Sequence, residues 1–116
     1  MNAFLRDLFV YGDAFWTFYH ERPRKVQDKI DYVIGLVRSI PMVPEKFLKH
    51  LEGTDGLYEI RVQAGSDIYR IFCFFDEGRI IILLNGFQKK SNKTPGKEIA
   101  RAKRLKDQYY ANKKTS

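Results

Sequence analysis

The alternation of apolar and polar side chains is clearest in three strand-like runs between residues 57 and 87. In the first, Leu57 to Ala64, every second residue is apolar or aromatic, as in a strand with one buried face. The second, Ile68 to Phe75, and the third, Arg79 to Phe87, are almost continuously apolar and rich in β-branched and aromatic residues. The turns at Gly65-Ser66 and Asp76-Glu77-Gly78 are short enough for hairpins. The pattern therefore predicts an antiparallel meander.

Helical periodicity appears on both sides of this meander. Residues 14 to 22 place aromatic side chains at three- and four-residue spacing, which is typical of a core-facing helix, although base stacking would use the same residues. An apolar stripe after Pro23 predicts a second helix, which should end near Ser39 because Pro41 and Pro44 cannot continue it. Residues 95 to 112 form a third amphipathic pattern, with Thr94 in position to cap it.

The order of these elements predicts an α+β fold. An apolar cluster within Phe4 to Gly12 indicates a short strand ahead of the first helix. We expect two N-terminal helices and a C-terminal helix packed on an antiparallel sheet, which consists of the meander and this N-terminal strand. Residues 41 to 49 are interpreted as a connector with at most one helical turn. A length of 116 residues predicts a single domain over residues 1–116.

Charge is distributed unevenly along the chain. Residues 1–86 contain 11 lysines and arginines against 12 acidic residues, whereas residues 87–116 contain 10 against 2. On the predicted C-terminal helix, Lys97, Arg101 and Arg104 lie opposite the apolar side. A basic stripe of this kind suits the phosphate backbone of a nucleic acid, which binds positive charge without regard to sequence. A plain solvated helix face would have the same composition, so both interpretations stay open.

Several classes of protein are disfavoured by composition. No segment approaches the roughly 18 apolar residues that span a bilayer, and no signal peptide is present, so we expect a cytoplasmic protein without a membrane partner. The single cysteine, Cys73, lies in the most apolar strand and is interpreted as a core residue. His20 and His50 have no second ligand at metal spacing, so no metal or other cofactor is expected.

Arg70 is a permanently charged residue inside the most apolar run. If the first hairpin turns at Gly65-Ser66, paired residue numbers sum to 131 and Arg61 faces Arg70. Like charges in opposed positions cost roughly 0.2 to 1 kcal/mol, so a negative group should lie between them. Glu59, diagonal to Arg70, would make a structural salt-bridged cluster. The alternative is the phosphate of a bound ligand.

Five short motifs follow the predicted strand and two helices. They are Leu51-Glu52-Gly53, Gly56 to Arg61, Tyr69-Arg70-Ile71, Leu84 to Lys90 and Lys93-Thr94-Pro95. In this order they resemble the RelE/ParE toxin superfamily, and most closely its HigB-like, phage-derived branch. The resemblance covers nearly the whole chain. It implies a toxin of a type II toxin–antitoxin system that occupies the decoding site of the ribosome, cuts messenger RNA and is neutralised by an antitoxin, commonly a helix-turn-helix protein.

The resemblance also implies roles for individual residues. Arg70 matches the strand arginine with which RelE-type toxins hold the scissile phosphate, and Arg61 matches a basic residue of the preceding strand. Lys89 and Lys90 match a basic pair near the end of the last strand. The implied reaction is a metal-free attack of a ribose 2′-hydroxyl on the adjacent phosphate. Either lysine would donate to or stabilise the leaving group, and Glu59 would be the base or a counter-ion.

The endoribonuclease is one of three functions that remain open. A ParE-like toxin has the same fold but binds DNA gyrase and cuts no RNA. A non-catalytic nucleic-acid-binding module would share the charge layout and bind in a salt-sensitive way without toxicity. Under the nuclease hypothesis, the residues expected to bind RNA without cutting it are Lys93, Lys97, Arg101 and Arg104.

Overall fold

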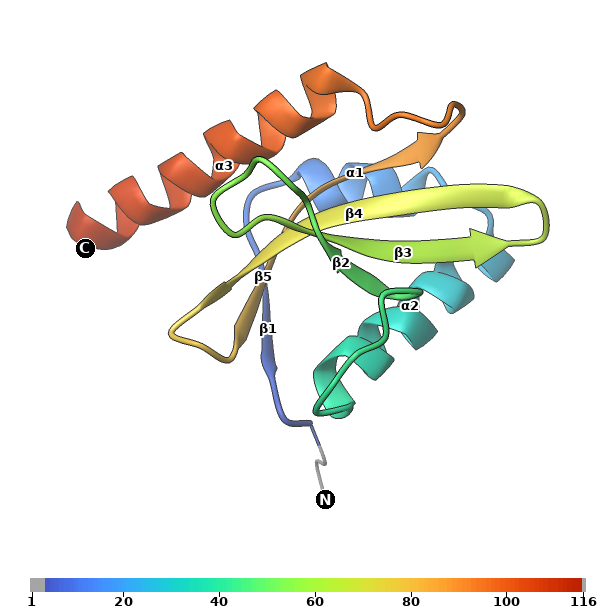
Figure 1. Ribbon diagram of the computed structural model, residues 1–116, viewed down its shortest axis with the longest axis horizontal. Helices are drawn as coiled ribbons and strands as arrows, with labels where there is room; N and C mark the ends of the chain where they lie inside the picture. Colours follow the sequence, from blue (N-terminus) through green and yellow to red (C-terminus); the bar gives the residue numbers. More distant parts are fainter. Residues whose placement is uncertain (1–3, 116) are drawn as a thin grey trace.

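The computed structural model describes residues 4–115, which form three helices and five strands (Figure 1). The α+β class predicted from the sequence is confirmed. In chain order the elements are β1 (Asp7–Val10), α1 (Ala14–His20), α2 (Arg24–Ser39), β2 (Leu48–His50), β3 (Tyr58–Ala64), β4 (Asp67–Asp76), β5 (Ile80–Lys89) and α3 (Gly96–Thr115).

The strands form one mixed sheet in the order β1-β5-β4-β3-β2. The meander of β3, β4 and β5 is antiparallel, as predicted. The prediction of a wholly antiparallel sheet was wrong, because β1 runs parallel to β5. The direction follows from α1, which packs against the second half of β5 through the close contact of Phe18 with Gly86. A chain that leaves β1 and enters α1 must therefore run the same way as β5.

A short fifth strand, β2, lies where the sequence predicts only a connector. It pairs antiparallel with β3, so that Lys49 is opposite Glu59. The backbone N–H of Arg61 donates to the carbonyl of Phe47 at 2.8 Å, and that of Leu51 donates to the carbonyl of Leu57 at 2.8 Å. Three residues are too few for a periodic pattern, so this strand depends on β3 as its template.

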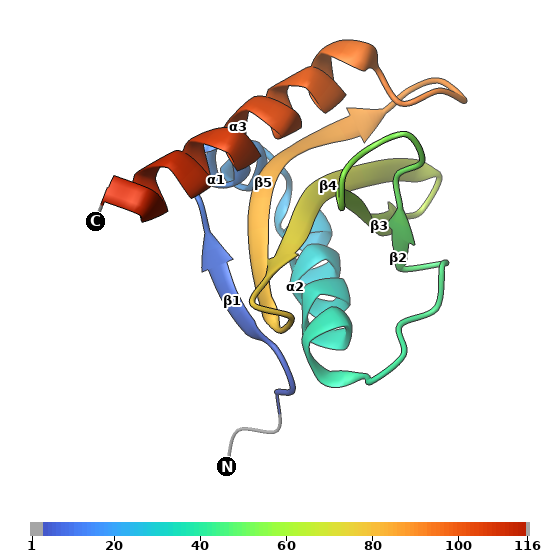
Figure 2. The same cartoon turned by 60° about the vertical axis from the view of Figure 1, so that its left-hand side comes forward.

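Helices cover both faces of the sheet (Figure 2). The helices α1 and α2 bury the face that includes Ile60, Val62 and Ile71, as predicted for a helix hairpin. The helix α3 covers part of the opposite face through an apolar side made up of Ile99, Ala102, Leu105 and Tyr109. Within residues 4–115, no helix is both long and apolar enough to span a membrane.

A register shift between β4 and β5 decides which side chains of β5 face α3. Ile71 pairs with Gly86 but Cys73 pairs with Leu83, so β5 holds one extra residue at this point. Because side chains alternate along a strand, an extra residue exchanges the two faces. Leu84 packs under α3 before the bulge, and Phe87 does so after it. The bulge thus brings odd-numbered residues beyond position 86 to the α3 side.

Cys73 is a core residue, as predicted from the sequence. The side chain is fully buried between the strands and belongs to the cluster under α1 and α2. Burial raises the pKa of the Cys73 thiol far above its ordinary value, because a thiolate would lose its hydration there. The thiol is therefore protonated and inert at neutral pH.

Candidate functional site

Arg61 and Arg70 occupy directly paired positions on β3 and β4, as the hairpin register predicted. Their side chains lie on the α3 side of the sheet and are 27% and 10% exposed. Glu59 lies between them, with its Oε1 atom 3.8 Å from Nε of Arg61 and 3.9 Å from Nε of Arg70. One buried carboxylate therefore faces two guanidinium groups.

Glu59 does not satisfy the two arginines. The Nε atoms of Arg61 and Arg70 are buried, and neither has a hydrogen-bond partner among the described residues. The second oxygen of Glu59, Oε2, instead accepts a hydrogen bond of 2.9 Å from the hydroxyl of Thr94. Buried donors without partners are rare in folded proteins and mark sites where an external acceptor can bind. Burial, followed by the proximity of Arg61, lowers the pKa of Arg70, which Glu59 opposes.

Lys89 belongs to the same cluster. It pairs with Ile68 near the open end of the β4–β5 hairpin, and the bulge in β5 places it on the face that carries Arg70. Its pKa is lowered by partial burial first and by Arg70 second, while Glu59 acts in the opposite direction. A lysine with a lowered pKa transfers a proton more readily at neutral pH than an exposed lysine.

Lys49 is a further member of the cluster, which the sequence did not reveal. It is directly opposite Glu59 in the β2–β3 pairing and half-buried, and its charge contributes to lowering the pKa of Lys89. The alternation of Lys49 between Leu48 and His50 is the only sequence pattern that points to it, and it is too short to be informative. Together, β2, β3, β4 and β5 contribute one cation each to this cationic cluster, which consists of Lys49, Arg61, Arg70 and Lys89.

Lys90 is not brought into the cationic cluster. It follows the last residue of β5 and is exposed. Without the bulge, even-numbered residues would have faced Arg70, so the extra residue selects Lys89 instead. Of the five residues predicted to be catalytic, the structure therefore brings four together, namely Glu59, Arg61, Arg70 and Lys89.

Thr94 has a different role from the one predicted. Its hydroxyl binds Glu59 and does not cap α3. The carbonyl of Pro95 accepts the N–H of Ile99 at 3.3 Å, and α3 begins at Gly96. The loop before α3 is thereby fastened to the floor of the cluster. The residues predicted to bind RNA, Lys93, Lys97, Arg101 and Arg104, are all exposed on this loop and on the outer side of α3.

A cleft of about 450 Å³ adjoins the two arginines. Its walls include Gln63 and Ile68 beside Arg61 and Arg70, and it extends to the side of the sheet that carries α2. This volume lies within the range of roughly 300 to 1,000 Å³ that is typical of small-molecule sites. The cluster is therefore accessible to a ligand of nucleotide size.

Comparison with known families gives one match. Residues 18–107 match the family described as "Phage derived protein Gp49-like (DUF891)". The chain belongs to this Gp49-like family. It is a family associated with RelE-like and toxin-like proteins. No curated protein matches the chain.

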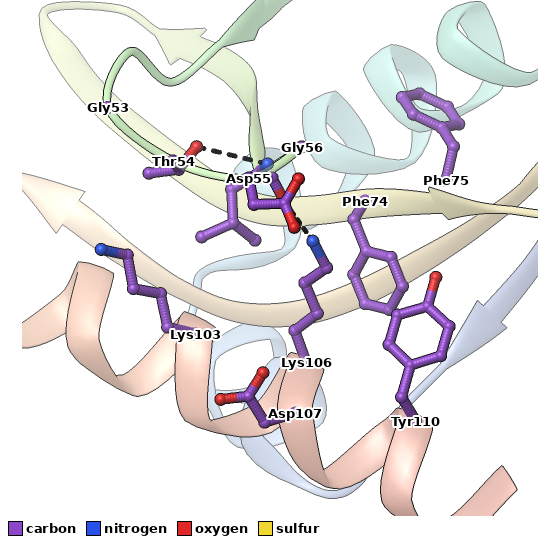
Figure 3. Close-up of a pocket in the computed structure, with 11 residues that line it drawn as sticks. Gly53, Thr54, Asp55, Gly56, Phe74, Phe75, Lys103, Lys106, Asp107 and Tyr110 are labelled. Carbon is purple, nitrogen blue, oxygen red and sulfur yellow. Dashed lines mark hydrogen bonds between the residues drawn. The ribbon is translucent and has the colours of Figure 1, made fainter. Parts of the chain in front are cut away.

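The Gp49-like protein has a larger cleft, of about 740 Å³, between the loop of residues 53–56 and α3 (Figure 3). Figure 3 shows Lys106 reaching from α3 to this loop, where its Nζ donates to the carbonyl oxygen of Asp55. Lys103 and Asp107 also line the cleft. Because its walls hold both charge signs and Lys106 already has a partner, this cleft lacks the unsatisfied positive charge of the cationic cluster.

Tyr109 and Tyr110 are structural in the Gp49-like protein. Their hydroxyls donate to the buried carboxylate of Asp76 at 2.7 and 3.3 Å, and Nζ of Lys113 lies 2.6 Å from the same carboxylate. This group holds the last turns of α3 against the end of β4. Asp76 is six residues beyond Arg70 on β4, or roughly 20 Å along an extended strand, so these tyrosines lie outside the cationic cluster.

Metal ligands are not gathered in this part of the protein. Among the residues that the structure describes, no three His, Cys, Asp or Glu side chains are arranged to hold a metal ion. The chemistry considered below uses only the cations and the carboxylate of the cluster.

Proposed function

We propose that this Gp49-like protein is the toxin of a type II toxin–antitoxin system, of the HigB-like kind, and that it cuts messenger RNA on the ribosome. The observation that supports this most directly is the pair of buried, unpartnered Nε atoms of Arg61 and Arg70 beside an open cleft. Their N–H groups suit the oxygens of a phosphodiester, since charge-assisted hydrogen bonds of this kind are the stronger ones. The family association supports the same conclusion.

The proposed reaction is transesterification within the RNA strand. The 2′-oxygen of the ribose attacks the adjacent phosphorus, the bond from phosphorus to the 5′-oxygen breaks, and a cyclic phosphate remains. Arg61 and Arg70 donate hydrogen bonds to the non-bridging oxygens and stabilise the negative charge that develops there. Lys89 protonates the departing 5′-oxygen, for which its lowered pKa suits it.

Glu59 is the carboxylate nearest the reacting groups. It accepts the proton of the 2′-hydroxyl or acts as a counter-ion to the arginines, and these two roles can be separated by mutation. An arginine cannot take the proton because it stays protonated at neutral pH. If Glu59 is only a counter-ion, the base is water or a group of the ribosome.

The exposed basic residues position the protein on its target. Lys93, Lys97 and Arg101 lie on the loop and helix that follow the cluster and are solvent-exposed, with Arg104 one turn further on. We assign them to contacts with ribosomal RNA, which fix orientation without reading sequence. A cognate antitoxin, expected to be a helix-turn-helix protein, would block the site. The protein acts in the cytoplasm, as a single domain, without a metal or other cofactor.

The test is to map RNA 5′ ends in cells after induced expression. We expect growth arrest together with new 5′-hydroxyl ends inside translated messages, and neither effect with Arg70→Gln at equal protein level. Growth arrest with altered DNA supercoiling and no new RNA ends would show a gyrase inhibitor instead. Full toxicity of Arg70→Gln would remove the arginine pair from the mechanism.

A further inference from the structure

Lys49 lies at one side of the cationic cluster and Lys89 at the other. Lys49 is on β2 and Lys89 is on β5, with β3 and β4 between them. Neighbouring strands are about 4.8 Å apart, so the cluster extends over roughly 14 Å across the sheet. A single phosphate group is too small to contact cations over that distance.

The charge of the cluster also exceeds that of one phosphate. The four cations face one carboxylate, so three positive charges are uncompensated. Lys49 is half-buried and has neither a hydrogen bond nor an ion pair with any described residue, although Glu59 is its cross-strand neighbour. The carboxylate of Glu59 is instead directed to Arg61, Arg70 and Thr94. A partly buried ammonium without a partner is available to a second anion.

From this arrangement we infer that the site binds two successive phosphates of one RNA strand, which crosses the sheet from β5 towards β2. This inference rests on the proposed function and adds a substrate requirement to it. Arg61, Arg70 and Lys89 hold the scissile phosphate, and Lys49 holds the phosphate next to it. Glu59, fastened by Thr94, stands between the two positions and keeps the phosphates apart. Lys49 is thus a binding residue for the strand that flanks the cut.

The inference is tested with short RNA strands in which a 2′-deoxy sugar blocks cleavage at the central linkage. One set has ordinary phosphates, and two others carry a neutral methylphosphonate on one or the other side of the central phosphate. Binding of each to the wild-type protein is measured by fluorescence anisotropy over a range of salt concentrations. The variants Lys49→Met and Lys49→Arg are measured in parallel, with Lys46→Met, an exposed lysine on the connector, as the control.

Each lost phosphate contact should lower the slope of log K against log salt by about 0.7 for a single strand. We expect this loss from Lys49→Met and from the methylphosphonate at one of the two flanking positions, and no further loss when the two changes are combined. Lys49→Arg should restore the slope, and Lys46→Met should leave it unchanged. Non-additivity of this kind identifies the two groups as direct partners.

The outcomes distinguish this inference from the proposed function. If the wild-type protein binds RNA in an Arg70-dependent way but tolerates both methylphosphonates, the two-phosphate site is refuted and the scissile-phosphate site stands. If the wild-type protein binds no RNA, the proposed function itself fails. The wild-type comparison needs no mutant, so a Lys49 variant that folds poorly does not remove the test.

Discussion

Arg61 and Arg70 lie directly opposite each other on β3 and β4, and the carboxylate of Glu59 approaches both without a hydrogen bond to either. In a cluster that served only stability, a carboxylate would be expected to bond one guanidinium in a bidentate manner. The observed arrangement leaves each buried Nε–H unused. It is therefore better suited to receive phosphate oxygens than to stabilise the folded chain.

Replacing Glu59 with glutamine separates its two possible roles. The change removes the negative charge that competes with phosphate, so Glu59→Gln should bind an uncleavable RNA more tightly than the wild-type protein does. If Glu59 is the general base, cleavage should fall by a factor of about 10² or more, in keeping with the usual contribution of such a group. If it is a counter-ion, cleavage should persist. Weaker RNA binding by this variant would contradict the placement of Glu59 beside the phosphate.

Lys89 should reduce the stability of the fold in a pH-dependent way. Its pKa is lower in the folded protein than in the unfolded chain, so the unfolded chain binds the proton more tightly. The unfavourable contribution is complete below the lowered pKa and disappears as the pH rises to the ordinary lysine value of about 10.4. At pH 7, Lys89→Gln should therefore be more stable than the wild-type protein by roughly 0.2 to 1 kcal/mol, the cost of opposed like charges.

Urea denaturation of Lys89→Gln at pH 7 and near pH 10 measures this effect. The advantage over the wild-type protein should shrink at the higher pH. Lys90→Gln is the matched control, because Lys90 is exposed beyond the strand and should have almost no effect at either pH. Equal stabilisation by both changes would mean that Lys89 is not strained by its neighbours.

Asp76 should stabilise the attachment of α3 in a way that is lost in acid. The hydrogen bond from Lys113, followed by that from Tyr109, lowers the pKa of this buried carboxyl. Because the pKa is lower in the folded state, the stabilisation is present above the unfolded value of about 3.9 and is lost as the pH falls through the folded value. At pH 7, Asp76→Asn should cost about 1.5 to 3 kcal/mol, typical of hydrogen bonds to a charged group.

Unfolding at pH 7, 5 and 3 tests the Asp76 prediction. The difference between the wild-type protein and Asp76→Asn should narrow towards pH 3. Glu77→Gln provides the control, since Glu77 also lies within 2.9 Å of Nζ of Lys113 but is exposed. A constant difference across this pH range would exclude Asp76 as the group that titrates.

Gly86 should be required for the close packing of α1 on β5. A Cβ atom added there would lie 2.5 Å from the ring of Phe18, a distance at which the ring or the strand must move. Gly86→Ala should therefore cost about 1 to 3 kcal/mol. Gly35→Ala in α2 is the control, because its Cβ would meet no atom within 4 Å and alanine is favoured over glycine in a helix by about 1 kcal/mol. A melting temperature that is lowered equally by both changes would contradict this account.

The arginine pair could be predicted from the sequence because a two-residue hairpin loop fixes the register of its strands. Gly65, with φ of 63°, and Ser66 form that loop, and Ala64 pairs with Asp67 as required. The register placed Arg61 opposite Arg70 before any coordinates were known. Glu59 followed from the same two-residue period.

The rest of the site depends on tertiary structure. Nothing in the run of Ile and Leu residues in β5 marks the bulge, yet the bulge decides that Lys89 and not Lys90 faces Arg70. Lys49 depends on a three-residue strand that forms only because β3 offers an edge. Thr94 has the sequence pattern of a helix cap, but the buried carboxylate of Glu59 competes for its hydroxyl and wins.

The most direct test of the phosphate site is to observe the Nε–H groups of the arginines by ¹⁵N NMR during titration with an uncleavable RNA oligonucleotide. The account predicts that the resonances of Arg61 and Arg70 shift together and saturate, while that of Arg24, which is 87% exposed on α2, stays unchanged. Shifts confined to the arginines of α3, with Arg61 and Arg70 unmoved at saturation, would contradict it.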